Sequence, residues 1–177
     1  GAPGGGQCAG RPGEAARTGH AFDLAVQAGG YAWWYVDALS EDGRFGLTVI
    51  AFIGSVFSPY YALARRRAPA GAAPATHHNA VNVALYGGSA ARWSMTERGA
   101  AQLQRTASSL QIGPSALHWE GDSLIIDIDE ISVPWPARVR GRIRVHPERI
   151  VRHPVALAST GGHVWWPIAP VARVEVE

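Results

Sequence analysis

The chain has 177 residues, of which 47% are hydrophobic and 17% charged, and this composition excludes an intrinsically disordered protein. Its formal net charge is only +2, which excludes the large basic field that would by itself recruit nucleic acid or an anionic membrane. The single cysteine, Cys8, excludes a disulfide framework and a cysteine-based zinc site, and fits a reducing, cytoplasmic setting.

The two ends of the chain differ in character from its middle. Residues 1–20 are rich in glycine, proline and alanine and have no large aliphatic residue, so we expect a disordered tail there. Residues 21–177 are expected to form one domain. The chain begins without Met and ends on the alternating VARVEVE, a strand pattern without a turn signal, so we expect a fragment truncated at its C-terminal end.

The densest aromatic stretch is GGYAWWYVDALSEDG, which predicts a strand. Because side chains alternate along a strand, Tyr31, Trp33 and Tyr35 share one face, and Trp34 and Val36 share the other. Two interpretations stay open: a fully buried core strand, or an aromatic wall that lines a long apolar cavity. Aromatic rings also suit carbocation chemistry, since the ring quadrupole stabilises a cation without reacting with it.

An uncharged run covers residues 47–64 and is followed by Arg65, Arg66 and Arg67. This resembles a membrane span with a positive flank. However, the run is shorter than the ~20 residues that a span needs and is interrupted by small and turn-forming residues. We therefore expect two buried strands separated near Gly54 or Pro59. Residues 65–78 are predicted to be a loop, which also explains the pair His77-His78 without a metal.

The rest of the chain predicts an all-β fold, since its apolar residues either alternate with polar ones or form short runs. A short helix is possible only around residues 97–109. Gly121-Asp122 predicts a hairpin turn. Four arginines alternate with small or apolar residues and therefore share one strand face: Arg138, Arg140, Arg142 and Arg144. We favour a solvent-exposed face over an RNA-binding surface for them.

Two acidic side chains, Asp127 and Asp129, also share a strand face. They could serve acid–base chemistry or bind a metal, but a solvated face paired with the arginine strand is favoured. In GGHVWWPIAP, His163 and Trp165 share a face beside Trp166. This histidine has either a structural role or a catalytic one.

Several blocks, taken in order, resemble the carotenoid 1,2-hydratase family, also called hydroxyneurosporene synthase. The resemblance runs from about Phe22 to Glu177 and rests on FDLAV, GGYAWWYVDALSEDGRFGLTVIAFIGSVFSPYYALAR, HNAVNVALYG, RWSMTERG, LQIGPSALHWEGDSLIIDIDE and WWPIAPVARVEVE. It implies a lipocalin-like barrel that is the first of two such domains. It also implies hydration of the terminal double bond of acyclic carotenoids such as neurosporene or lycopene, with no organic cofactor and no metal, in a photosynthetic bacterium.

The resemblance also implies site residues. His163 and Trp165 match a His-x-Trp pair that assists catalysis, whereas the acid, an Asp in a Tyr-x-Asp motif, is expected beyond Glu177. Asp37, Asp127 or Asp129 could replace it only by facing the cavity. The chain alone is therefore expected to be inactive. The aromatic residues expected to bind substrate are Tyr31, Trp33, Trp34, Tyr35 and Trp166.

The expected partners are the carotenoid, water and a C-terminal domain of the same protein, with no nucleic acid. Because carotenoids partition into bilayers, we expect a cytoplasmic protein in peripheral contact with the inner photosynthetic membrane. The alternative hypothesis is a protein that is not an enzyme: a noncatalytic lipocalin-like carrier of carotenoid or another apolar ligand. A cavity without a carboxyl group would favour that carrier.

Overall fold

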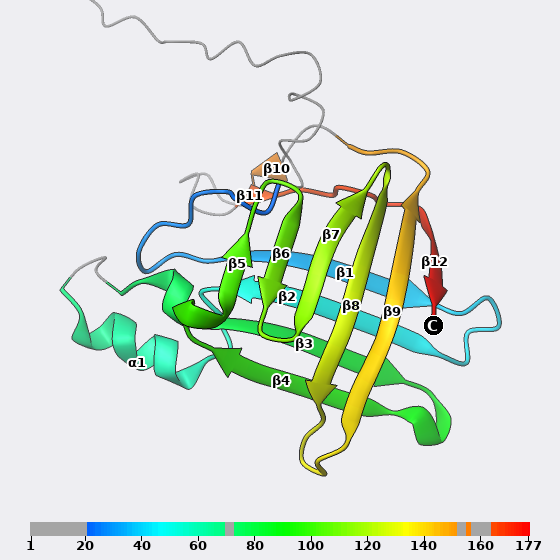
Figure 1. Ribbon diagram of the computed structural model, residues 1–177, viewed down its shortest axis with the longest axis horizontal. Helices are drawn as coiled ribbons and strands as arrows, with labels where there is room; N and C mark the ends of the chain where they lie inside the picture. The colour runs from blue at the N-terminus through cyan, green and yellow to red at the C-terminus, as the bar shows by residue number, and fades with distance from the viewer. Residues whose placement is uncertain (1–20, 70–72, 152–154, 157–163) are drawn as a thin grey trace, which may run out of the picture.

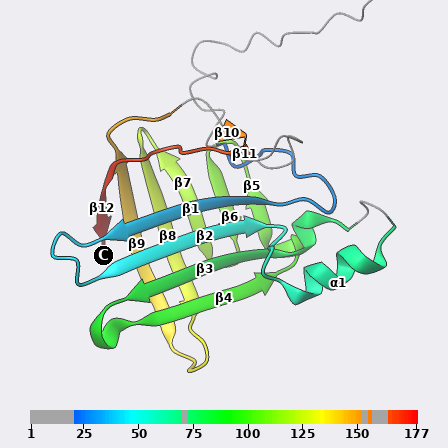
Figure 2. The same cartoon turned by 180° about the vertical axis from the view of Figure 1, so that it is seen from behind.

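Two antiparallel β-sheets stacked face to face form the body of the protein. The structure is a computed structural model that describes residues 21–69, 73–151, 155–156 and 164–177. Sheet A has the strand order β1-β2-β3-β4, and sheet B has the order β12-β9-β8-β7-β6-β5. The strands of one sheet run across those of the other (Figure 1), and sheet A comes to the front when the molecule is viewed from behind (Figure 2). The predicted tail at residues 1–20 lies outside the described residues.

Neighbouring strands in each sheet are almost all neighbours along the chain, so the topology is an up-and-down meander. The exception is β12, which returns to pair with β9. The strands of sheet A are β1 (Ala32–Leu39), β2 (Gly46–Ile53), β3 (Asn79–Tyr86) and β4 (Arg92–Arg98). Those of sheet B are β5 (Leu103–Arg105), β6 (Ser109–Ile112), β7 (Ser115–Glu120), β8 (Ser123–Ile131), β9 (Arg138–Pro147) and β12 (Ala172–Val176). A two-stranded sheet joins β10 (Val155–Ala156) to β11 (Val164–Trp165).

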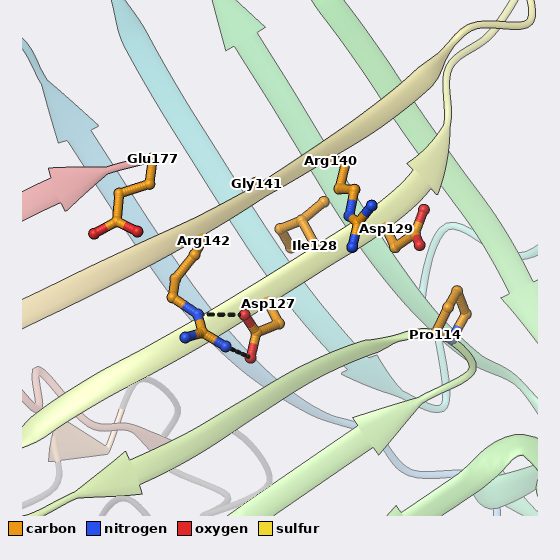
Figure 3. Close-up of a pocket in the computed structure, with 8 residues that line it drawn as sticks. All are labelled: Pro114, Asp127, Ile128, Asp129, Arg140, Gly141, Arg142 and Glu177. Carbon is orange, nitrogen blue, oxygen red and sulfur yellow. Dashed lines mark hydrogen bonds and ion pairs between the residues drawn. The ribbon is translucent and has the colours of Figure 1, made fainter.

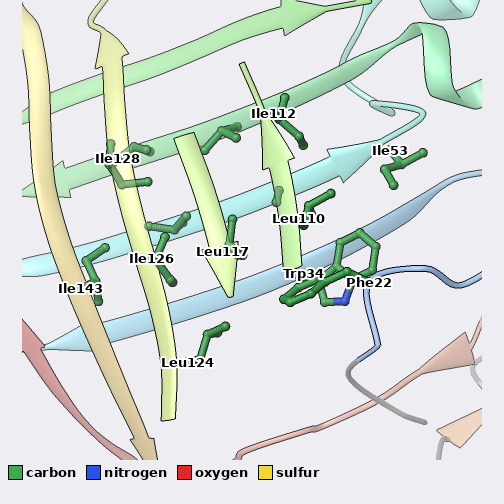
Figure 4. Packing of buried hydrophobic residues seen from close by; sticks show 14 of the residues in the cluster. Phe22, Trp34, Ile53, Leu110, Ile112, Leu117, Leu124, Ile126, Ile128 and Ile143 are labelled. Carbon is green, nitrogen blue, oxygen red and sulfur yellow. The ribbon is translucent and has the colours of Figure 1, made fainter. Parts of the chain in front are cut away.

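The hydrophobic core lies between the two sheets. Alternate residues of β2, such as Val49 and Ile53, belong to the same buried cluster as Ile126 of β8, which is fully buried. Figure 4 shows this packing, with Phe22 and Trp34 closing one side. Each fully buried aliphatic side chain contributes about 1.5–3 kcal/mol by leaving water, so this layer is the main force that holds the sheets together.

A buried ion pair also joins the sheets. The guanidinium of Arg98 on β4 donates to Oε2 of Glu130 on β8 at 2.7 Å, and the Glu130 side chain is fully buried. The Ser115 hydroxyl donates to the other carboxylate oxygen at 2.7 Å. Every oxygen of the buried carboxylate thus has a partner, which is the condition under which a charge is tolerated in a core.

The segment at residues 47–64 corrects one prediction. It forms one strand, β2, followed by helix α1 (Pro59–Arg67) rather than by a second strand. Gly54 ends the strand with φ +69°, where an added Cβ would lie 2.5 Å from the Gly30 carbonyl oxygen. Ser58 then caps the helix by accepting a hydrogen bond from the Tyr61 amide, and Pro59 occupies its first turn. In the described part of the chain, no helix is long and apolar enough to cross a membrane.

Two further expectations about local structure were wrong. Residues 97–109 form the end of β4, a single 3₁₀ turn at Ala100–Gln102, β5 and the start of β6 instead of a helix. Residues 65–67 belong to α1 and Ala75–His77 form a 3₁₀ turn, so residues 65–78 are only partly a loop; residues 70–72 lie outside the described ranges.

Candidate functional site

The face of sheet A that points away from sheet B is rich in aromatic side chains, and we call it the aromatic face. Trp33 is 45% exposed and Tyr35 is 56% exposed, while the intervening Trp34 is 7% exposed and packs in the core. The predicted alternation along β1 is therefore confirmed. Neither interpretation of this strand holds in full, because β1 is buried on one face only and the other face is open on the outside of sheet A.

The register of sheet A assembles this face from all four strands. Trp33 lies opposite Phe52, Phe52 opposite Ala80, and Ala80 opposite Glu97. The next rows are Tyr35, Ile50, Asn82 and Met95, then Asp37, Thr48, Ala84 and Trp93. Eight residues of β1 extend roughly 27 Å at about 3.4 Å per residue. The face is therefore long and mainly apolar, but β3 is buried on both sides as far as Ala84 and Phe52 is fully buried, so β1 and β4 supply most of its exposed side chains.

Ring contacts run along one end of the aromatic face. Tyr31 and Trp33 have ring centroids 5.1 Å apart, and Trp33 meets Phe52 edge to face at 6.0 Å. Phe52 in turn meets Phe57, in the loop before α1, edge to face at 5.5 Å. Contacts of this type are attractive, so the four rings form one connected aromatic row.

A first carboxylate on this face is Asp37. Its Oδ1 accepts a hydrogen bond of 2.8 Å from the Thr48 hydroxyl on β2. Partial burial and the negative charge of Asp37 raise the pKa of the neighbouring Tyr35. The Tyr35 phenol therefore stays protonated at neutral pH and remains a hydrogen-bond donor beside the carboxylate.

A second carboxylate, Glu97, lies at the opposite edge. Its Oε1 is 2.5 Å from His78 Nδ1, and its Oε2 accepts a hydrogen bond of 2.5 Å from the Ser58 hydroxyl. The His78 ring packs on Tyr61 with ring centroids 4.8 Å apart. The site therefore combines an aromatic floor with two positioned acidic groups, and this combination can bind an elongated apolar molecule and act on one part of it.

Three residues in the rows of this face were not predicted as site residues: Phe52, Trp93 and Glu97. The alternation of LTVIAFIG did place Phe52 on the face of β2 opposite Ile53. What the sequence lacked was the register, which decides that Phe52 lies beside Trp33 and in the same row as Glu97.

The outer face of sheet B is charged instead. Gly121 turns with φ +59° between β7 and β8, as predicted, and Asp127 and Asp129 on β8 lie opposite arginines of β9. Asp127 pairs with Arg142 at 2.6 Å, and Asp129 pairs with Arg138 at 2.6 Å. The favoured interpretation of these residues, a solvated face with mutual charge pairing, is confirmed.

A shallow hollow of about 640 Å³ lies on this charged face (Figure 3). Charged residues dominate its lining, which consists of Pro114, Asp127, Ile128, Asp129, Arg140, Gly141, Arg142 and Glu177. Such a lining suits water and ions and would leave an apolar ligand beside desolvated charges. The hollow is therefore a poor site for an apolar ligand.

The remaining predicted site residues do not gather with the aromatic face. Trp34 packs against Phe22, with ring centroids 5.2 Å apart, inside the core. Trp166 donates its indole N–H to the Val151 carbonyl at 2.9 Å, and the exposed Trp165 belongs to β11. His163 lies outside the described residues. In the described ranges, no group of three or more His, Cys, Asp or Glu side chains is arranged to hold a metal.

Comparison with known proteins gives one family. The model of the family described as carotenoid hydratase CrtC matches residues 49–177. The chain is 55% identical over 159 residues to an acyclic carotenoid 1,2-hydratase of Thiocapsa roseopersicina, an alignment that covers 90% of this chain and 38% of the relative. It is 54% identical over 156 residues to the same enzyme of Rubrivivax gelatinosus, covering 88% of this chain and 38% of the relative.

A third relative, the acyclic carotenoid 1,2-hydratase of Cereibacter sphaeroides, is 43% identical over 130 residues, which cover 73% of this chain and 44% of the relative. No solved structure matches the chain significantly. The chain thus spans well under half the length of the curated relatives that it matches. The family match covers more than two thirds of the chain, and the chain belongs to the carotenoid hydratase CrtC family.

Proposed function

We propose that this chain is the carotenoid-binding part of an acyclic carotenoid 1,2-hydratase, and that the aromatic face binds the substrate. The observation that carries the proposal is the row of contacting rings from Tyr31 to Phe57 on the aromatic face, which is exposed along β1 and β4 and also carries Asp37 and Glu97. A polyene is flat, apolar and long, so it buries the most surface on a floor of this shape.

The proposed reaction adds water to the terminal double bond of an acyclic carotenoid such as neurosporene or lycopene. An acid transfers a proton to the less substituted alkene carbon, and a tertiary cation forms at the neighbouring carbon. Water bonds to that cation, and the resulting oxonium loses a proton to a base, so no net proton is consumed. Aromatic rings such as Trp33 and Tyr35 stabilise the cation through their electron-rich faces.

The roles of individual residues in this reaction follow from the family resemblance. His163 and Trp165 are proposed to assist the acid, and the acid itself is proposed to lie beyond Glu177. Of the three aspartates considered as substitutes, Asp37 is the one on the aromatic face, whereas Asp127 and Asp129 are paired with arginines on the other sheet.

We also propose that the two sheets are a lipocalin-like barrel and the first of two such domains. The up-and-down order of strands within each sheet supports this, because it is the connectivity of up-and-down barrels. The space between the sheets is filled by core side chains. In this proposal the ligand therefore lies on the outside of sheet A and not between the sheets.

The alternative from another class is a carrier that holds a carotenoid without changing it. An exposed aromatic floor is compatible with a carrier. The two carboxylates with fixed partners on that floor favour the enzyme, since a carrier of a hydrocarbon gains nothing from groups that must stay solvated or paired.

A hydration assay tests the proposal. Lycopene is supplied to this chain and to the same chain extended to the length of its relatives, and the hydroxylated product is followed by chromatography and mass. We expect product from the extended protein only. Retention of carotenoid by both proteins with product from neither would favour the carrier.

Activity of the 177-residue chain itself would place the acid within it. Asp37→Asn would then abolish the product, while Asp127→Asn, the matched change on the charged face, would leave the product unchanged.

A further inference from the structure

We propose that helix α1 and the loop before it dock the protein on an anionic lipid bilayer at the end of the aromatic face. The docking patch consists of Phe57, Tyr60 and Leu63 with Arg65, Arg66 and Arg67. The proposal rests on the proposed function in one respect: a carotenoid dissolved in a bilayer needs a route to the aromatic face.

The helix has two apolar sides, and only one of them is used by the fold. Tyr61 is buried, and Ala64 and Ala68 pack against the core. On the other side Tyr60 is 70% exposed and Leu63 is exposed one turn further on. Folding of the described residues leaves this second apolar side in contact with water, which is the pattern of a helix that rests on another apolar phase.

The charge of the patch identifies the partner. Arg65, Arg66 and Arg67 form the last turn of α1, and all three are exposed. From residue 43 to residue 96 the sequence has no acidic residue, so the three arginines have no carboxylate near them along the chain. Exposed tyrosine and phenylalanine beside a cluster of arginines suit the boundary between lipid headgroups and acyl chains.

The position of the patch connects it with the proposed substrate site. Phe57 is 63% exposed and meets Phe52 edge to face, and Phe52 meets Trp33 on the aromatic face. Figure 1 shows α1 projecting beyond one end of sheet A, away from the turn between β1 and β2. A bilayer in contact with α1 would thus touch the end of the aromatic row, and an apolar chain could pass along the rings without crossing open water.

The experiment is co-sedimentation of the 177-residue chain with vesicles that contain no carotenoid. One set is phosphatidylcholine alone, and the other contains phosphatidylglycerol as well. We expect binding to the anionic vesicles and much less to the neutral ones, with the difference reduced in 0.5 M salt because salt screens exposed charges. The absence of carotenoid separates this test from the proposed function, which can fail while docking holds.

Two variants and two matched controls locate the surface. Replacing the three α1 arginines by Gln should weaken anionic binding by about five-fold per charge, on the order of a hundred-fold in total. The control replaces Arg44, Arg140 and Arg149 by Gln, which removes the same charge elsewhere. Tyr60→Ser with Leu63→Ser should weaken binding to both vesicle types, and Leu39→Ser with Ile131→Ser, also exposed, should not.

Circular dichroism checks that each variant folds. If the protein with both Tyr60→Ser and Leu63→Ser does not fold, Tyr60→Ser alone is used in its place. Three results would overturn the proposal. These are no binding of the parent chain to anionic vesicles, equal losses in the α1 variants and their controls, or α1 variants that lose stability yet bind as before. The last result would mean that the arginines act only on the C-terminal end of the helix.

Discussion

At the scale of single residues, the clearest feature is that carboxylates on the two faces of β8 have different environments. Glu130 is a fully buried carboxylate, and it is tolerated because Arg98 and Ser115 occupy both of its oxygens. Asp127 and Asp129 are paired at a partly exposed surface, where such pairs contribute little to stability. A substitution should therefore matter far more at Glu130 than at either aspartate.

Glu130→Ala is expected to lower the free energy of unfolding by about 3–5 kcal/mol, because it leaves the Arg98 guanidinium buried without its partner. Arg98→Met with Glu130→Leu should recover most of that loss by removing both charges. Urea unfolding of the three proteins measures this. Equal destabilisation by the single and the double replacement would show that packing volume, and not the unpaired charge, is what matters.

The pair between Asp129 and Arg138 predicts a pH dependence. The hydrogen bonds and charge of Arg138 hold the pKa of Asp129 below its usual value of about 3.9. The contribution of this pair to the free energy of unfolding is thus fully present above pH ~4 and is lost as the pH falls through the lowered pKa. Asp129→Asn should make the fall in stability below pH ~4 less steep and leave the slope near neutral pH unchanged; Asp42 and Glu175, whose pKa values are also lowered, maintain the rest of that fall. An unchanged acid limb in urea unfolding at several pH values would contradict this.

At the scale of elements, the sequence predicted strands well where alternation was strong and failed where a turn decided the outcome. The β1 alternation, the hairpin at Gly121 and the arginine face of β9 were all predicted, because each depends on neighbouring residues. Helix α1 was missed because its apolar composition matches that of a strand. The signals that mark it are Gly54 in a left-handed conformation and the Ser58-Pro59 start.

Ser58→Ala tests the start of α1. The hydroxyl accepts from the Tyr61 amide and donates to Glu97, so its removal should cost about 1–2 kcal/mol of the free energy of unfolding. Ser123→Ala, which removes a hydroxyl that contacts His146 at a strand start, is a comparison with no helix cap at stake. Chemical unfolding checks both, and a loss at Ser58 no larger than at Ser123 would mean that the cap contributes little.

At the scale of the whole molecule, the two sheets share a core but present opposite outer surfaces. Sheet B exposes paired charges, and sheet A exposes a row of rings that ends at the arginine-bearing helix. The aromatic residues of β1 could be chosen from the sequence, yet Trp34 belongs to the core, and Phe52, itself fully buried, connects the rings of Trp33 and Phe57. Which residue of β2 lies beside Trp33 depends on the register between paired strands, and the alternation within one strand does not encode that register.

The central claim, that a carotenoid binds on the outer face of sheet A, is tested most directly by lycopene retention. Lycopene is offered in detergent micelles, and the polyene absorbance that elutes with the protein is measured for the parent chain, Tyr35→Asp and Trp135→Asp. Trp135 is 84% exposed and lies between β8 and β9, outside the aromatic face. We predict that Tyr35→Asp loses at least about ten-fold of the retention while Trp135→Asp keeps it. Equal retention by all three proteins, or equal loss in both variants, would contradict the assignment of this face.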